Sequence, residues 1–200
     1  MAFDKKYIII KESLGLFLKY GVQHITMDDI ANKCGVSKKT IYKYFNDKSD
    51  LLCQVMKLKA NELKKMMAIK QQSNTNALKE LCGFFDIMNT TVTGMSPTFI
   101  MELKKHHSTI FLELLKYKSK TILPFLIQNI EKGKREGLYK IDLNTEEICQ
   151  AFDDLSRIIF FNGFNNSINT IKFLNSLFLH RLVSSKGLEI FNEFNRNKMI

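Results

Sequence analysis

The 200-residue sequence predicts an all-α fold in two parts, a small N-terminal part of three short helices and a larger helical part behind it. Only two prolines, Pro97 and Pro124, interrupt the chain, and apolar residues recur mainly at helical spacing, with little strand-like alternation. The composition changes near KQQSNTN, where the charge density falls. We expect one domain over 1–48 and another over 49–200, linked by a helix from about 47 to 70 whose end this change in composition marks.

Start and stop signals define the helices of the first part. Ile9 and Phe17 belong to an apolar stripe on a first helix that Gly21 ends. Thr26 can cap a second helix over 28–34, because its hydroxyl can accept from a free backbone N–H of the first turn. Gly35 then permits a tight turn, and Ser37 is a good cap for a third helix that reaches about residue 45. Amphipathic segments continue the pattern over 77–91, 99–105, 111–133, 145–163 and 168–185.

The charge is strongly positive and unevenly placed. The formal net charge is +10, of which residues 1–70 carry +7 and the rest +3. Such an excess favours a polyanionic partner, either nucleic acid or an anionic membrane surface. We expect the polyanion to bind in the first third of the chain.

Several function classes lack a sequence signal. The four cysteines are far apart without a CxxC motif, and no Cys/His spacing suggests a metal, so we predict neither metal nor cofactor. HExxH, GxSxG and a glycine-rich phosphate loop are missing, which argues against an enzyme. The start MAFDKKYIII does not resemble a signal peptide, and no run of about eighteen apolar residues occurs. We therefore expect a reduced, cytoplasmic protein with no membrane partner.

The stretch VSKKTIYKYF points to DNA. Two helices joined by a glycine turn form a helix-turn-helix unit, in which the second helix lies in the major groove. Helical periodicity turns Ile41 and Phe45 toward the core, and the cationic and hydroxyl side chains then face outward, where they suit phosphates and base edges. A solvated basic face on an ordinary helix is the alternative. The outward set is Lys38, Lys39, Thr40, Tyr42, Lys43 and Tyr44.

The order of residues resembles a known family. The segment ITMDDIANKCGVSKKTIYKYFNDKSDLL resembles the DNA-binding domain of the TetR family of bacterial transcriptional regulators, and the likeness is specific over about 8–55. The resemblance implies phosphate contacts from Thr26, Tyr42 and Lys48. It implies groove contacts from Lys38, Lys39, Thr40 and Lys43. The predicted DNA-binding set is Thr26, Ser37, Lys38, Lys39, Thr40, Tyr42, Lys43, Tyr44 and Lys48.

The resemblance also implies a ligand cavity and a dimer in the larger part. A two-fold dimer would place two recognition helices about 34 Å apart on a pseudo-palindromic operator. Apolar stripes on the last two long segments predict the dimer interface at Phe152, Leu155, Ile159, Leu174, Leu177 and Phe178. A pocket for a small apolar ligand is expected from Phe84, Phe85, Met88, Met95, Phe99, Met101, His106 and Phe111, although such residues also form ordinary cores.

The function expected from the sequence is a dimeric regulator, a repressor that a small apolar ligand releases from its operator. An effector-free DNA-binding assembly or nucleoid-associated protein on the same fold is the main alternative. Binding to a membrane surface through KLKANELKKMMAI is a third hypothesis. Activation in place of repression stays open.

Overall fold

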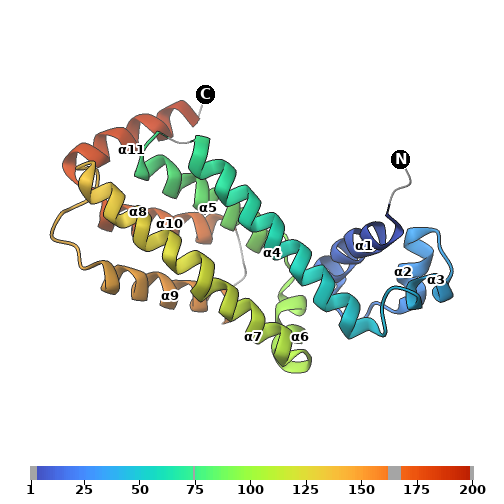
Figure 1. The fold of residues 1–200 in the computed structure, drawn as a ribbon. Coiled ribbons are helices and arrows are strands. Elements are labelled where there is room, and N and C mark those ends of the chain that lie inside the picture. The colour runs from blue at the N-terminus through green and yellow to red at the C-terminus, as the bar shows by residue number, and fades with distance from the viewer. Residues whose placement is uncertain (1–3, 74, 162–167, 199–200) are drawn as a thin grey trace. The chain divides into compact units, whose positions relative to one another are not determined.

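The computed structural model describes residues 4–73, 75–161 and 168–198, the side chains of 73, 158–161, 168 and 194–198 excepted. Within these ranges the regular elements are helices (Figure 1), so the prediction of an all-α fold with an N-terminal helix-turn-helix and a larger helical part is confirmed. The chain divides into two compact units. One contains the chain up to Lys64 together with Gly94–Lys116, and the other contains Lys65–Thr93 and the chain from Tyr117 onward.

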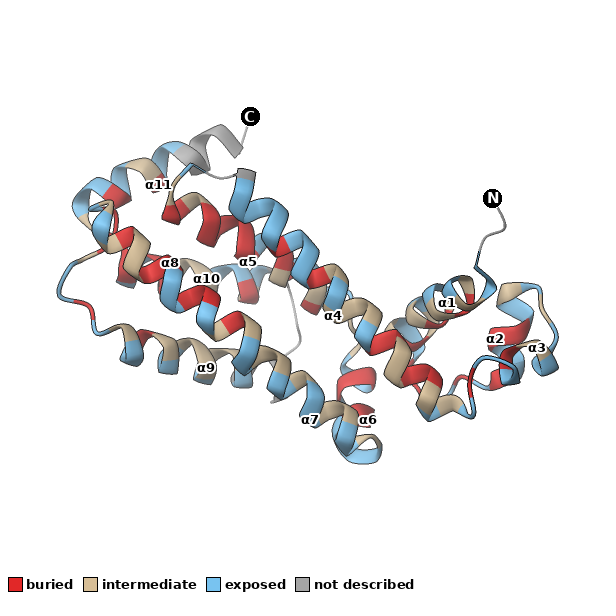
Figure 2. Ribbon diagram, in the orientation of Figure 1, coloured by how far each residue is buried: buried red, intermediate tan, exposed pale blue. Residues whose placement is uncertain are grey.

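The first unit is built around α1, which packs against both α2 and α6, while α2 packs against α3. Ile9, Phe17, Ile30 and Phe99 are fully buried and form part of its core (Figure 2). Its elements are α1 (Lys5–Tyr20), α2 (Met27–Cys34), α3 (Lys38–Tyr42), the first part of α4 (Lys48–Ser73), α6 (Pro97–His106) and the start of α7 (Ser108–Tyr117).

The second unit contains a ring of four helices. Helix α8 packs against both α5 and α9, and α10 also packs against both α5 and α9. The rings of Phe84 and Phe125 lie 5.0 Å apart in its core, and the rings of Phe152 and Phe178 lie 5.9 Å apart. Its elements are the end of α4, α5 (Ala77–Thr93), the π-helical turn η1 (Lys118–Ile122), α8 (Leu123–Arg135), α9 (Thr145–Phe161), α10 (Ile168–Leu182) and α11 (Ser185–Lys198).

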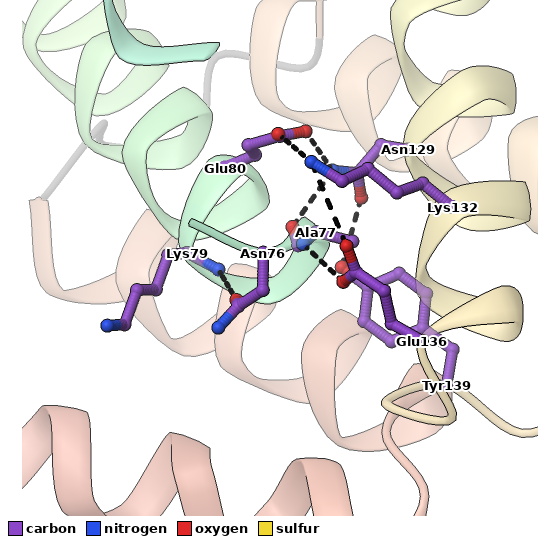
Figure 3. A network of polar contacts seen from close by, with 8 residues as sticks. All are labelled: Asn76, Ala77, Lys79, Glu80, Asn129, Lys132, Glu136 and Tyr139. Atoms are coloured by element: carbon purple, nitrogen blue, oxygen red, sulfur yellow. Dashed lines mark hydrogen bonds and ion pairs between the residues drawn. The ribbon is translucent and has the colours of Figure 1, made fainter. Parts of the chain in front are cut away.

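A buried polar network fastens the first turn of α5 to α8 (Figure 3). Glu80 and Asn129 are both buried, and the ammonium of Lys132 pairs with the Glu80 carboxylate. Asn129 Nδ2 donates to the Ala77 carbonyl oxygen at 2.8 Å, and the Tyr139 hydroxyl donates to Asn129 Oδ1 at 3.0 Å. Burial raises the pKa of Tyr139, which keeps its hydroxyl protonated as a donor. Because the buried groups satisfy one another, the network specifies how α5 and α8 meet.

Local helix signals agree with the structure, but some helix ends differ from expectation. The third helix ends at Tyr42, earlier than the predicted end near 45, because residues 43–44 form a turn. The segment expected as one helix over 111–133 contains the π-helical turn η1. Helix α11, which was not predicted from the sequence, follows α10 after only two residues. Among the described residues, none of the helices combines the length and the apolar run that a bilayer span requires.

Candidate nucleic-acid interface

The helix-turn-helix is fixed by two caps and a left-handed turn. Thr26 caps α2: its hydroxyl accepts from the Asp29 N–H, while the Asp29 carboxylate accepts from the Thr26 N–H at 2.8 Å. Gly35 ends α2 with a φ of 63°, a conformation that favours glycine. Ser37 caps α3 by accepting from the Thr40 N–H. The predicted caps and turn residue are confirmed, and they set the direction in which α3 leaves α2.

Helix α3 separates an apolar seam from a polar face. Ile41 and Phe45 are buried at 0% and 1% exposure, which ties the helix to the core of the first unit. Tyr42 and Tyr44 remain 48% and 39% exposed. The side chains of Ser37, Lys38, Lys39 and Lys43 are exposed with them, and Thr40 is partly exposed. The seven predicted side chains on α3 and at its two ends are thus exposed at least in part.

Several side chains of this face already have partners within the chain. The Lys38 ammonium lies 2.8 Å from an Asp28 carboxylate oxygen, and this hydrogen bond raises the pKa of Lys38. The Ser37 and Thr40 hydroxyls lie 2.9 Å apart, within hydrogen-bond distance. The Thr26 hydroxyl donates to Asp29 at 2.6 Å and lowers the pKa of that carboxyl. A DNA phosphate would have to share or replace these partners.

Lys48 binds the loop between α1 and α2. Its ammonium donates to the carbonyl oxygens of Val22 at 3.0 Å and Ile25 at 3.1 Å. From α6, the Glu102 carboxylate accepts from the N–H groups of Val22 and Gln23. The loop is therefore held through its carbonyls by one charged side chain and through its amides by another.

The residues predicted for a ligand pocket are divided between the two units. A cavity of about 40 Å³ in the second unit has Phe85 and Met88 in its wall. Phe84 is buried beside it in the aromatic core. The remaining five belong to the first unit: Phe99 is fully buried, Met101 and His106 are exposed, and Met95 and Phe111 are partly exposed.

Four residues predicted for the dimer interface line the same cavity. Phe152 and Leu155 reach it from α9, and Leu174 and Phe178 reach it from α10. Leu177 differs, because its side chain is 51% exposed on α10. The side chain of Ile159 lies outside the described residues.

The cavity is apolar apart from an amide pair and one hydroxyl. Asn175 Nδ2 donates to Asn89 Oδ1 at 2.8 Å, and both residues line the wall. Ser156 contributes its hydroxyl, which donates to the Asp153 carbonyl oxygen at 2.7 Å. No ionisable residue lines this cavity within the part of the chain that the structure describes. Uncharged groups are therefore the partners that a ligand would meet there.

Sequence reasoning missed Glu102, Glu80 and Asn89, yet each carries a recognisable signal. Glu102 stands next to Leu103 and three residues after Phe99, so it lies on the apolar face of α6. The other two occupy equivalent places on the buried face of α5. A charged or amide residue on the apolar stripe of a helix indicates a buried polar partner, because burial without one is unfavourable.

Comparisons with known proteins agree with this architecture. Residues 9–55 match the family model described as bacterial regulatory proteins, tetR family. The chain is 24% identical over 154 residues to the uncharacterized HTH-type transcriptional regulator YhgD of Bacillus subtilis (strain 168), covering 70% of this chain and 74% of that protein.

Two solved structures share the fold at lower identity. A TetR-family transcriptional regulator from Agrobacterium tumefaciens superimposes with a TM-score of 0.73 at 16% identity, over 90% of this chain and 98% of that one. A Saccharomonospora viridis protein solved in complex with choline gives 0.68 at 16% identity, over 90% and 97% of the two chains. Residues 9–55 thus carry an N-terminal domain of the TetR family of bacterial regulatory proteins, and the rest of the chain shares its fold with solved structures of that family.

Proposed function

We propose that the protein is a transcriptional regulator that binds a specific DNA sequence through α3. The observation that carries this proposal is the exposed face of α3, where lysine, tyrosine and hydroxyl side chains stand over a buried seam of Ile41 and Phe45. Such a face can neutralise phosphates and reach base edges while the seam fixes its direction. Its relatives are named transcriptional regulators, and the chain is accordingly not an enzyme.

Selection of bound duplexes from random DNA by the purified full-length chain tests this proposal. We expect enrichment of a pseudo-palindromic sequence. The variant Lys39→Ala, Lys43→Ala should lose the enrichment, because both side chains are exposed on α3. The variant Lys104→Ala, Lys105→Ala removes the same charge from the exposed part of α6 and serves as the matched control. Failure of the wild-type chain to enrich any sequence would refute specific DNA binding.

A homodimer is the second part of the proposal. Phe173 and Leu177 stand one helical turn apart on α10 and are 62% and 51% exposed, an apolar pair that a second copy would cover. A two-fold dimer would present two α3 helices to successive major-groove faces about 34 Å apart. The four predicted interface residues that line the cavity would then support α9 and α10 from within, whereas Leu177 would meet the partner.

We further propose that a small, largely apolar and uncharged ligand releases the protein from DNA, so that it acts as a repressor in the bacterial cytoplasm. The cavity wall supports this ligand class, since its aromatic and aliphatic side chains surround one amide pair. A similar fold has been solved in complex with choline, which supports a small-molecule role for the architecture. Choline is a cation, however, and the described wall here offers no carboxylate to pair with one.

The size of the cavity favours a second candidate function. At about 40 Å³ it is far below the roughly 300 Å³ of a typical small-molecule site, so a ligand would have to displace side chains such as Met88. A regulator or nucleoid-associated protein without an effector would need no such space.

Thermal unfolding and DNA release distinguish the two, with decanoic acid, methyl decanoate, naphthalene and choline as probes. The repressor proposal requires an uncharged apolar probe to raise the melting temperature and to weaken DNA binding. If naphthalene and the ester change neither, the effector-free function is favoured.

A further inference from the structure

The loop between α1 and α2 is held by two charged side chains that come from distant parts of the sequence. Val22 is fully buried. Its N–H donates to the Glu102 carboxylate, and its carbonyl oxygen accepts from the Lys48 ammonium at 3.0 Å. Gln23 donates to the same carboxylate at 3.0 Å, and Ile25 accepts from the same ammonium at 3.1 Å. Four backbone groups of a four-residue stretch are thus satisfied by two ions.

This loop ends where the helix-turn-helix begins. Thr26, the cap of α2, follows Ile25 directly, and α2 in turn packs against α3. Any change in the path of residues 22–25 would therefore alter the direction of α2 and, through the Gly35 turn, that of α3. The position of the DNA-binding face therefore depends on a loop that lies outside that face.

Glu102 is suited to a fixed structural role. Its side chain is only 8% exposed although it carries a charge, and backbone N–H donors are the partners that make a buried carboxylate tolerable. The Gly21 Cα lies against it so closely that a Cβ there would come within 2.8 Å of Oε2. The carboxylate, the glycine and the two amides form one close-packed arrangement.

We propose that Lys48 and Glu102 are positioning residues for DNA binding. Lys48 binds carbonyl oxygens of the loop over 22–25 and Glu102 binds its N–H groups, and together they fix the direction of α2 and α3. For Lys48 this differs from the phosphate contact that the family resemblance implies. Two of its three ammonium donors are engaged by the loop, so its main contribution is to the geometry of the helix-turn-helix. The proposal rests on the proposed DNA-binding function, which it refines.

Hydrogen exchange of the full-length protein without DNA tests the loop itself. In Glu102→Gln, the amides of Val22 and Gln23 should exchange at least about tenfold faster than in the wild type, because an amide oxygen is a weaker acceptor than a carboxylate. The amide of Ile41, which donates to the carbonyl oxygen of the cap residue Ser37, should keep its rate and report that the unit stays folded. Glu113→Gln makes the same charge change at an exposed site and should leave all three rates unchanged.

DNA binding tests the role of Lys48, with the duplex that the wild-type chain selects as the probe. Lys48→Ala should weaken binding by about tenfold at every salt concentration while leaving the slope of log K against log salt as in the wild type. By contrast, Lys39→Ala, which removes an exposed lysine of α3, should reduce that slope by about one. Glu102→Ala should weaken binding with an unchanged slope, and Glu102→Gln should recover part of the affinity.

The outcomes separate the proposal from the function on which it rests. Wild-type exchange rates at Val22 and Gln23 in Glu102→Gln, or a slope reduced by about one in Lys48→Ala, would overturn the positioning role. A wild-type chain that binds no DNA would instead refute the proposed function, and the exchange rates would still decide whether the two ions hold the loop.

Discussion

Removing the hydroxyl of Tyr139 should destabilise the second unit, because it leaves the buried amide oxygen of Asn129 without this donor. Asn129 is 2% exposed, and its Oδ1 accepts from the Tyr139 hydroxyl at 3.0 Å. In Tyr139→Phe the ring keeps its place, but a buried acceptor loses its donor, which costs about 1–3 kcal/mol. For a chain of this length, a loss of about 2 kcal/mol in the unfolding free energy should lower the melting temperature by about 4–8 °C.

Calorimetry and urea unfolding followed by circular dichroism measure this change. Tyr7→Phe is the matched control, because its phenol is 45% exposed and its loss should change the unfolding free energy little. The double variant Asn129→Ala, Tyr139→Phe should be scarcely less stable than Asn129→Ala alone, since the unpaired acceptor is gone. A loss below about 0.5 kcal/mol in Tyr139→Phe, within the range of ordinary surface substitutions, would refute the reasoning.

Three further predictions concern charge, assembly and pH. Asp28→Asn should tighten DNA binding by a few-fold in a titration at low salt, because it frees the Lys38 ammonium; unchanged or weaker binding would contradict this. Leu177→Asp should yield monomers by light scattering, whereas Ile141→Asp, at another exposed apolar side chain, should leave the dimer intact. The pKa of His107 is lowered by burial and by the nearby charge of Lys48. The contribution of His107 to stability is therefore present above the unfolded pKa of about 6.5, and it is lost as the pH falls through the lower pKa of the folded state. His107→Gln should flatten the decline of the unfolding free energy below that pH, and an unchanged decline would exclude His107 as its source.

The parts of the fold that the sequence predicts are those set by neighbours along the chain. Thr26 and Ser37 cap helices through backbone groups three residues away, and Gly35 turns the chain at its own position. The burial of Ile41 and Phe45 follows from their spacing of one helical turn. These features are local, so composition and periodicity are sufficient to find them.

The candidate site is less predictable because its remaining interactions are distant in sequence. The pairing of Glu102 with Val22 depends on α6 packing against α1, which no local pattern specifies. The same holds for Lys48, whose family motif suggests an outward role while its ammonium bonds the loop. The residues predicted for a pocket from Met and Phe alone are divided between the two units, since Phe99 fills the core of a different unit from Phe85.

The contact between Gly21 and Glu102 constrains how this chain can vary during evolution. Gly21 has a φ of 83°, which strains any residue with a side chain, and a Cβ there would also come within 2.8 Å of the carboxylate. Replacing the acid would remove only the second obstacle, so the glycine is constrained by its own backbone as well as by its neighbour. Homologues should therefore lose the acid more readily than the glycine, and a side chain at the first position should be rare whatever residue stands at the second.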